Sequence, residues 1–223
     1  MAVTTATVLE QFDREGYYVY RGLLDPEEDL HPGVDEYSDL LDGLLGRLAE
    51  AGEVQDTYSR LPFFQRMARF IGETGSAYYN HFQIRLPYEV VTEETPIHLG
   101  PAIFRLLRSP RLLNGIEVFL GPEISCNPVN VVRLKPPERM LRSDTSHAGI
   151  AQVPWHQDLV NYPKEATDTE LLTVWVPLSR AGVENGCLKV IPGSHREELE
   201  IHCPADVRDP VQRKIAGGGI PDE

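Results

Sequence analysis

The chain has 223 residues, of which 41% are hydrophobic and 25% are charged. This composition provides enough apolar material for one large folded domain and is unlike that of a disordered protein. Acidic residues outnumber basic ones by 34 to 21, which gives a formal net charge of −13. Such a charge repels phosphate backbones and anionic lipid surfaces, so we expect neither nucleic acid nor a membrane as a partner.

Cysteine use and the absence of targeting signals indicate the compartment. The three cysteines, Cys126, Cys187 and Cys203, form no Cys-x-x-Cys pair, which argues against a disulfide framework and a zinc ribbon. The first ten residues lack the basic and apolar regions of a secretory signal, and no apolar run approaches the ~18 residues of a membrane span. We therefore expect a cytoplasmic protein.

Helical patterns dominate the first half of the chain. A helix is predicted around residues 8–12 and ends at Gly16, and a short strand is predicted over 17–20. Residues 35–50 carry an apolar stripe at helical spacing, which predicts a core-facing helix. After a strand-like stretch at 82–86, two short helices are predicted, one beginning near Pro101 and one from Pro110 to Gly121-Pro122, with Ser109 as its N-cap.

The second half reads as strands joined by glycine and proline turns. Strands are predicted over 129–134, 151–156, 171–176 and 187–191, the third of them buried, and Asn185-Gly186 predicts a tight turn. Helices followed by strands favour an α+β fold that ends in an antiparallel sandwich or barrel. We expect a single domain over 1–223, with a mostly helical part at 1–122 and the strands at 123–223.

The motif that carries chemistry is Trp155-His156-Gln157-Asp158. In a strand, residues two apart point to the same side, so His156 and Asp158 can aim an imidazole and a carboxylate at one point. These donors suit Fe(II), and a second histidine would complete a two-histidine, one-carboxylate face with open positions. The triplet alone also fits a surface pair in a loop.

The surroundings of the triplet resemble those of a known family. From Val153 the chain reads VPWHQDLVNYP, and further on LLTVWVPLSRAGVENGCLKVIPGSHR, which ends at Arg196. This succession resembles the phytanoyl-CoA dioxygenase family of Fe(II)- and 2-oxoglutarate-dependent oxygenases. Weaker matches at residues 12–24, 110–122 and 134–137 extend the resemblance over nearly the whole chain.

The resemblance implies a fold, an activity and a set of site residues. The fold would be N-terminal helices packed on a double-stranded β-helix (a jelly-roll, as in cupins). His156 and Asp158 would bind Fe(II), with no catalytic residues beyond these ligands, while Gln157, Trp175 and Lys135 would contact 2-oxoglutarate. The enzyme would use O₂ to hydroxylate a small organic substrate and release succinate and CO₂. Trp175 also fits a core aromatic, and Lys135 also fits a surface lysine.

Parts of the family pattern are not found in this sequence. The family carries a distal histidine ligand and an arginine for the far carboxylate of 2-oxoglutarate, and neither stands here in the family's context. His195 lies in a Pro-Gly-Ser-His turn and reads as structural, with His195 or His202 as third ligand the alternative. We therefore expect the jelly-roll to be incomplete at its C-terminus and the chain to be truncated. A non-catalytic small-molecule-binding module and a cupin-like isomerase or binder with another metal remain alternatives. The sequence does not determine the substrate or the oligomeric state.

Overall fold

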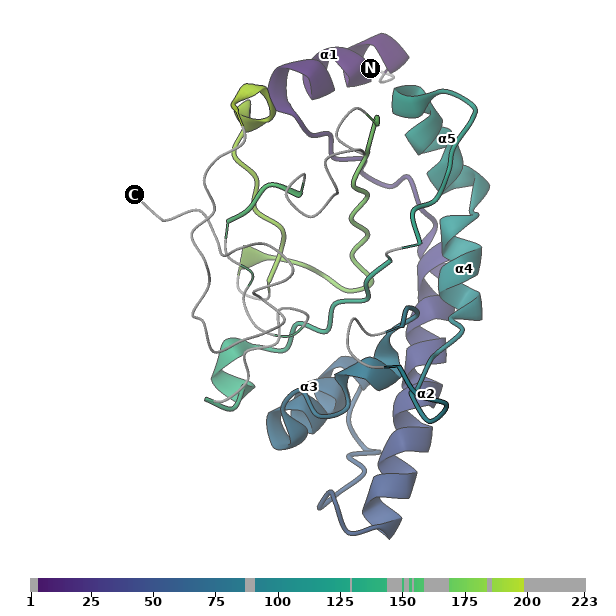
Figure 1. Cartoon of the computed structure of the whole chain (residues 1–223), viewed down its shortest axis with the longest axis vertical. Coiled ribbons are helices and arrows are strands. Elements are labelled where there is room, and N and C mark those ends of the chain that lie inside the picture. Colours follow the sequence, from purple (N-terminus) through teal and green to yellow (C-terminus); the bar gives the residue numbers. More distant parts are fainter. Residues whose placement is uncertain are drawn as a thin grey trace.

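The computed structural model describes residues 4–86, 91–128, 130–143, 150, 153, 155–158, 169–183 and 186–198 (Figure 1). Helices dominate the first half of this described part. They are α1 (Thr5–Glu15), α2 (His31–Glu50), α3 (Phe63–Thr74), α4 (Pro101–Leu107) and α5 (Pro110–Leu120). Short helical turns occur at Pro26–Leu30, Tyr79–Phe82, Glu138–Met140 and Ser194–Arg196. No helix in these ranges is both long enough and apolar enough to cross a lipid bilayer.

Helix α1 forms and ends as the sequence predicts. Thr4 is the N-cap, with its side chain accepting a hydrogen bond from the Thr7 amide at 3.3 Å. Gly16 ends the helix in the left-handed region, with φ 81°, and its amide donates to the carbonyl of Phe12. The Phe12 ring packs against Phe119 of α5, with 4.6 Å between ring centroids.

The segment after α1 is not the strand that its aromatic residues predict. Residues 17–20 have neither helical nor strand structure, and they pass close to α5 instead. The Tyr20 hydroxyl donates to the carbonyl of Gly115 at 3.1 Å, and a Cβ on Gly115 would lie 2.8 Å from Leu23 Cδ2. Side-chain packing against a helix therefore takes the place of strand pairing, and a glycine in α5 permits the close approach.

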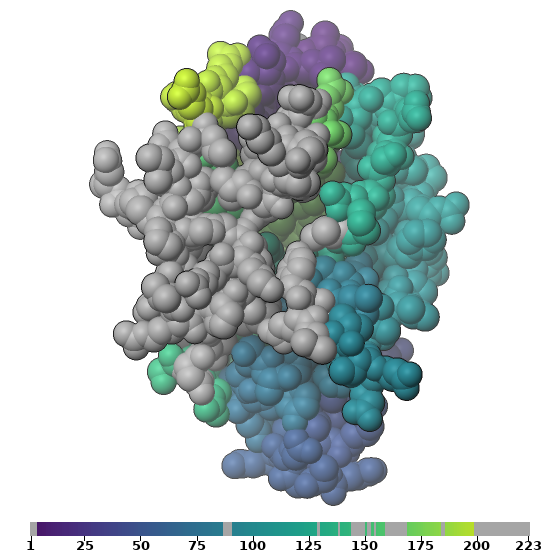
Figure 2. Space-filling view, in the orientation of Figure 1, coloured from purple at the N-terminus to yellow at the C-terminus, as the bar shows by residue number. Residues whose placement is uncertain are grey.

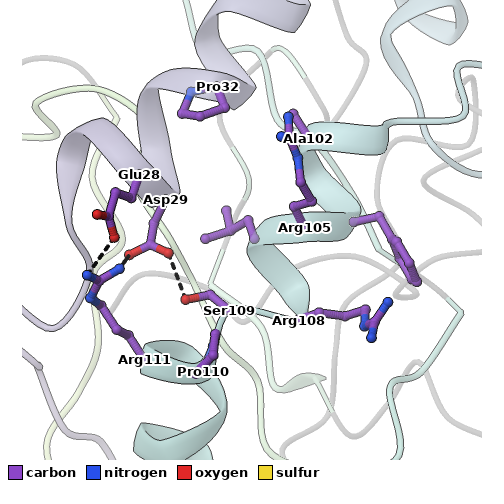
Figure 3. Close-up of a pocket in the computed structure, with 11 residues that line it drawn as sticks. Glu28, Asp29, Pro32, Ala102, Arg105, Arg108, Ser109, Pro110 and Arg111 are labelled. Carbon is purple, nitrogen blue, oxygen red and sulfur yellow. Dashed lines mark hydrogen bonds and ion pairs between the residues drawn. The ribbon is translucent and has the colours of Figure 1, made fainter.

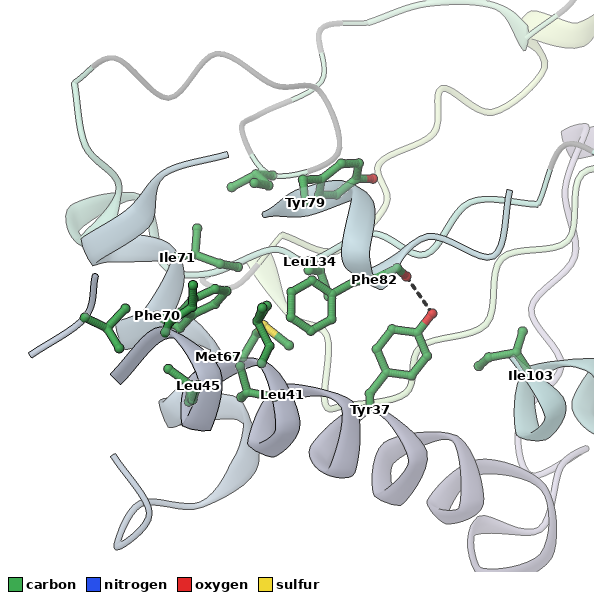
Figure 4. Close-up of a cluster of buried hydrophobic side chains, with 14 residues drawn as sticks. Tyr37, Leu41, Leu45, Met67, Phe70, Ile71, Tyr79, Phe82, Ile103 and Leu134 are labelled. Atoms are coloured by element: carbon green, nitrogen blue, oxygen red, sulfur yellow. Dashed lines mark hydrogen bonds between the residues drawn. The ribbon is translucent and has the colours of Figure 1, made fainter. Parts of the chain in front are cut away.

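Helix α2 is the longest helix of the described part and supplies much of the core. Its predicted apolar stripe is confirmed, because Leu41 and Leu45 are fully buried and Tyr37 is 3% exposed. The Tyr37 hydroxyl donates to the Phe82 carbonyl at 2.7 Å inside the core (Figure 4). The core cluster consists of Tyr37, Leu41, Leu44, Leu45, Leu48, Val54, Met67, Phe70, Ile71, Tyr79, Phe82, Ile103, Leu134 and Ile150.

Helix α3, which the sequence analysis did not identify, packs on α2 near one end of the molecule (Figure 1). It places Met67, Phe70 and Ile71 in the core. Arg66 is also buried on α3, and its guanidinium pairs with Asp42 of α2. A charged group this buried needs such a partner, so the ion pair compensates for burying arginine between the two helices.

Helices α4 and α5 begin at the predicted prolines, and acidic side chains from earlier segments bind near the start of each. Ser109 stands at the N-cap position of α5, yet its hydroxyl donates to Asp29 at 2.7 Å rather than capping the helix. The first turn of α4 is bound by Glu36 of α2, which accepts a hydrogen bond from the Ala102 amide at 2.6 Å. The other oxygen of Glu36 contacts His98 Nε2 at 2.9 Å.

The predicted strand over 82–86 is also absent. Phe82 ends a short helical turn, and Gln83 follows it into the core with 2% of its surface exposed. The Gln83 amide donates to the Val132 carbonyl at 2.8 Å. A buried side-chain hydrogen bond thus links this segment to the later chain without backbone pairing.

No strand is assigned among the described residues. The described parts of the segments predicted as strands in the second half run as irregular chain in Figure 1. Half of 151–156 lies outside these residues, so the jelly-roll remains a prediction. The prediction that 171–176 is buried is wrong for part of its length. Leu171, Val174 and Trp175 are between 43% and 45% exposed. On this segment Leu178 packs against the core cluster, whereas these three residues do not.

Candidate metal centre

His156 and Asp158 face each other in the structure. Their side-chain atoms Nε2 and Oδ1 are 3.2 Å apart, and the side chains are 27% and 49% exposed. The two side chains meet as the sequence predicts, but not through strand alternation, because His156 has no regular structure and Asp158 stands in a helical turn. The pair is therefore half open to solvent, with both donor atoms directed at one small region.

Asp158 has a second partner on another segment. The Thr173 hydroxyl donates to Asp158 Oδ2 at 2.8 Å, which leaves Oδ1 directed at His156. The hydrogen bond with His156 lowers the pKa of Asp158 most, burial opposes this, and the Thr173 bond and the nearby Arg133 charge lower it further. The carboxylate is thus held charged, which is the form that binds a metal ion.

The separation of the two donor atoms fits one bound cation. Two ligands with bonds of about 2.1 Å at a right angle lie about 3 Å apart, close to the observed distance. The same distance suits a hydrogen bond in the metal-free protein. A neutral nitrogen and an anionic oxygen match the donors that non-haem Fe(II) takes in its two-histidine, one-carboxylate sites, so the residues present fit two of the three positions.

Lys135 stands on the same short segment as the core residues Val132 and Leu134. Leu134 belongs to the core cluster and Val132 packs against it, whereas Arg133 is exposed and Lys135 is half-buried. Burial lowers the pKa of Lys135 to about 8, and the charge of Arg133 lowers it as well. Lys135 is therefore not a well-solvated surface lysine, and Gly186 lies against its stem, where an added Cβ would be 3.4 Å from Lys135 Cβ.

Of the other two residues predicted for 2-oxoglutarate, Gln157 lies between His156 and Asp158 in sequence and Trp175 follows them on a later segment. Gln157 is half-buried, and its amide donates to the carbonyl of Glu198 at 3.3 Å. Trp175 is 43% exposed, which excludes the alternative of a buried core aromatic. It is two residues beyond Thr173, the hydrogen-bond partner of Asp158. The structure brings the Trp175 segment to the pair, and the contact of Trp175 with a cosubstrate remains a prediction.

His195 does not join the pair. Its Nε2 lies 2.9 Å from the Asp13 carbonyl at the end of α1, which agrees with the prediction that it is structural. His31 contacts Glu27, and His98 contacts Glu36. Within the ranges given above, no group of three or more His, Cys, Asp and Glu side chains is arranged to hold a metal ion. His147 and His202 lie outside the described residues.

An open pocket of about 380 Å³ lies elsewhere, between the start of α2 and helices α4 and α5 (Figure 3). Arg105, Arg108 and Arg111 line it, but Arg111 is paired with Glu28 and Asp29. None of the residues predicted for the iron site lines this pocket. It is therefore separate from the candidate metal centre.

Sequence reasoning missed Thr173, Arg133 and Glu198. Thr173 and Arg133 each stand two residues before a residue that was predicted, Trp175 and Lys135, so strand alternation could have placed them on the same side. Glu198 takes part through its backbone carbonyl, which no sequence pattern reveals.

Comparison with known proteins agrees with the resemblance noted in the sequence. The family model described as "Phytanoyl-CoA dioxygenase (PhyH)" matches residues 12–217. The human protein named "Phytanoyl-CoA dioxygenase, peroxisomal" is 28% identical over 114 residues, 51% of this chain and 31% of its own length. A protein of Stutzerimonas stutzeri named "Probable alpha-ketoglutarate-dependent hypophosphite dioxygenase" is 30% identical over 109 residues, 49% of this chain and 33% of its own length.

The matched region thus spans about a third of each of these relatives. No solved structure matches the chain.

Proposed function

Since the chain belongs to the phytanoyl-CoA dioxygenase family, we propose that it contributes His156 and Asp158 to the Fe(II) site of a 2-oxoglutarate-dependent oxygenase. The observation that carries the proposal is the 3.2 Å approach of His156 Nε2 to Asp158 Oδ1. Two donors of the right chemistry meet at one point, on the two residues where the family pattern has its ligands.

The residues around the pair support this role. Thr173 binds the oxygen of Asp158 that faces away from His156, so it fixes the carboxylate in the orientation that a ligand needs. Hydrogen-bonded partners of this kind are usual around metal ligands, and they raise the affinity for the ion by restricting rotation. When bound, the iron would supply the O₂ chemistry that converts 2-oxoglutarate to succinate and CO₂ and hydroxylates a small organic substrate.

Lys135, Gln157 and Trp175 are proposed to contact the 2-oxoglutarate. A half-buried lysine gives a point charge for a carboxylate, and a bound anion would restore the pKa that burial has lowered. The half-exposed indole of Trp175 can cover an apolar part of the cosubstrate and exclude water from it. Gln157 would orient the cosubstrate from between the two ligands.

The names of the relatives support the cosubstrate rather than one substrate. The bacterial relative is named for α-ketoglutarate dependence and hypophosphite, and the human one for phytanoyl-CoA. These substrates have little in common, whereas the oxygenase chemistry is shared. Hypophosphite is inorganic, so the small organic substrate that we propose rests on the family resemblance and not on these two names.

One observation favours a second candidate, a non-catalytic small-molecule-binding fragment of the same fold. In the part of the chain that the structure describes, no third His, Cys, Asp or Glu joins His156 and Asp158. Two ligands alone hold a divalent ion weakly, because site geometry provides most of the selectivity. The two candidates differ in whether bound 2-oxoglutarate is turned over.

The test measures Mn²⁺ binding by electron paramagnetic resonance and succinate release with Fe(II), 2-oxoglutarate and O₂. His156→Ala and Asp158→Ala are each expected to abolish Mn²⁺ binding. His31→Ala is the matched control, because His31 is an exposed histidine paired with Glu27 on another element. Succinate release that depends on both ligands supports the oxygenase, and binding without turnover supports the fragment. Mn²⁺ binding that survives both substitutions would refute the proposed site.

A further inference from the structure

The turn at 193–198 is bound to the C-terminal end of α1 by several hydrogen bonds. The Gly193 amide donates to the Glu15 carbonyl at 2.8 Å. His195 Nε2 and Arg196 Nη2 both contact the Asp13 carbonyl, at 2.9 and 2.6 Å. Arg196 Nη2 also contacts Asp13 Oδ2 at 3.2 Å. Figure 2 shows this turn against α1 at one end of the molecule.

These contacts satisfy groups that a helix cannot satisfy itself. The last four carbonyls of an α-helix lack partners within the helix, and they carry the negative end of its dipole. Amide, imidazole and guanidinium donors from a segment about 180 residues away bind two of them. The packing is close, since a Cβ on Gly16 would lie 2.4 Å from the His195 ring. The turn is therefore held in one place relative to α1.

The other end of the same turn reaches the candidate metal centre. The Glu198 carbonyl accepts the hydrogen bond from the Gln157 amide at 3.3 Å. Gln157 stands between the two proposed ligands, and its side chain binds Glu198 while those of His156 and Asp158 face each other. The hydrogen bond to Glu198 restricts the Gln157 side chain and therefore the backbone of residues 156–158, which sets the positions of His156 Nε2 and Asp158 Oδ1.

We infer that His195 and Arg196 are positioning residues for the proposed iron ligands. They fix the 193–198 turn to α1, and the turn fixes Gln157 through the Glu198 carbonyl. This inference rests on the proposed function for its consequence in metal binding, but the mechanical link from α1 to residues 155–158 can be measured without a metal. Restricting a ligand before the ion arrives strengthens binding, because less conformational freedom is then lost.

The experiment uses the full chain with His195→Ala and Arg196→Ala. Amide hydrogen exchange is followed by mass spectrometry on peptides covering residues 155–158, and Mn²⁺ affinity is measured in parallel. Both variants are expected to speed exchange at 155–158 and to weaken Mn²⁺ binding by about 3- to 10-fold, less than loss of a direct partner of a ligand causes. His195→Gln keeps a donor near the position of Nε2 and is expected to restore both values.

Two further variants separate positioning from general stability. Tyr20→Phe removes one hydrogen bond to α5, at the Gly115 carbonyl, and is expected to leave exchange at 155–158 and Mn²⁺ affinity unchanged. Gln157→Met removes the amide donor while α1 and the turn stay bound, so it is expected to reproduce the effects of His195→Ala. If the alanine variants unfold, Gln157→Met still tests whether the hydrogen bond to Glu198 restricts residues 155–158.

Unchanged exchange at 155–158 in His195→Ala, Arg196→Ala and Gln157→Met would overturn the inference. An equal effect of Tyr20→Phe would overturn it as well, because the link would then be general stability. If the unsubstituted chain binds no Mn²⁺, the proposed function fails, and exchange at 155–158 alone decides whether the turn positions this segment.

Discussion

Replacing Gly16 by alanine is expected to destabilise the protein by more than the backbone strain at this position explains. Gly16 has φ 81°, a conformation that alanine adopts with difficulty. Its added methyl group would also lie 2.4 Å from His195 Nδ1 and 2.7 Å from Cγ. Real carbon atoms do not approach so closely, so the 193–198 turn must move away from α1.

The magnitude follows from these two effects. Alanine in the left-handed region costs about 1 kcal/mol. Moving the turn weakens the hydrogen bonds to Asp13 and Glu15, each worth about 1 kcal/mol at most, because these groups are largely exposed. We therefore expect a loss of about 2–3 kcal/mol in the free energy of unfolding for Gly16→Ala.

Urea denaturation followed by tryptophan fluorescence measures this loss, with Gly22→Ala as the matched control. Gly22 has φ 69°, but no atom lies within 4 Å of its added Cβ, so only the backbone cost of about 1 kcal/mol applies. Equal losses for the two variants would refute the docking of the turn on α1, because the strain at Gly16 would then be purely local.

Three further predictions concern the core and the candidate site. Leu45→Ala is expected to lower the free energy of unfolding by about 2–5 kcal/mol, because Leu45 is fully buried in the core; Leu9, 40% exposed, is the control. Thr173→Val removes a hydrogen bond that favours the charged carboxylate, so the pKa of Asp158 is expected to rise in an NMR titration. Lys135→Met removes a lysine whose pKa burial lowers to about 8 from an ordinary value of 10.5. The unsubstituted protein is then expected to gain stability relative to this variant as pH rises from about 8 to 10.5, in urea denaturation at each pH.

Each of these predictions has an outcome that contradicts it. Equal effects of Leu45→Ala and Leu9→Ala would mean that α2 does not face the core as described. An unchanged Asp158 titration in Thr173→Val would mean that the hydroxyl does not bind the carboxylate in solution. For Lys135, the unfolded lysine binds more protons than the folded one between pH 8 and 10.5, so a gain in stability is required. A constant difference across that range would exclude the burial.

Local patterns predicted the helices whose apolar spacing and end residues agree. The apolar spacing from Tyr37 to Leu48 predicts a helix with one buried side, and Gly16 predicts the end of a helix. Both signals come from residues that are close together in the sequence. Tyr17–Tyr20 misled, because aromatic residues favour strands only when a partner strand is present, and here α5 is the partner. Ser109 was correctly predicted at the N-cap position of α5, but the sequence did not reveal that its hydroxyl donates to Asp29.

Residue spacing and the family resemblance predicted the two proposed ligands of the candidate site, but not all of the residues that bind them. The two-residue spacing of His156 and Asp158 predicted that their side chains converge, although they meet at a helical turn and not along an extended strand. Thr173 and the Glu198 carbonyl are 15 and 40 residues from Asp158, and only the folded chain decides that they meet it or its neighbour. The spacing from Trp175 hints at Thr173, but nothing in one sequence marks the Glu198 carbonyl as a partner.

The hydrogen bonds between α1 and the 193–196 turn also set an order of events during synthesis on the ribosome. His195 and Arg196 are 182 and 183 residues from Asp13 in sequence. At about 5–20 residues per second, α1 is synthesised about 10–40 s before its partner turn. Its apolar side can meet α5 well before then, through Phe12 and Phe119. The C-terminal end of α1 therefore lacks these hydrogen bonds until residues 193–196 are made, and a nascent chain that stalls before residue 193 would hold this helix by one side only.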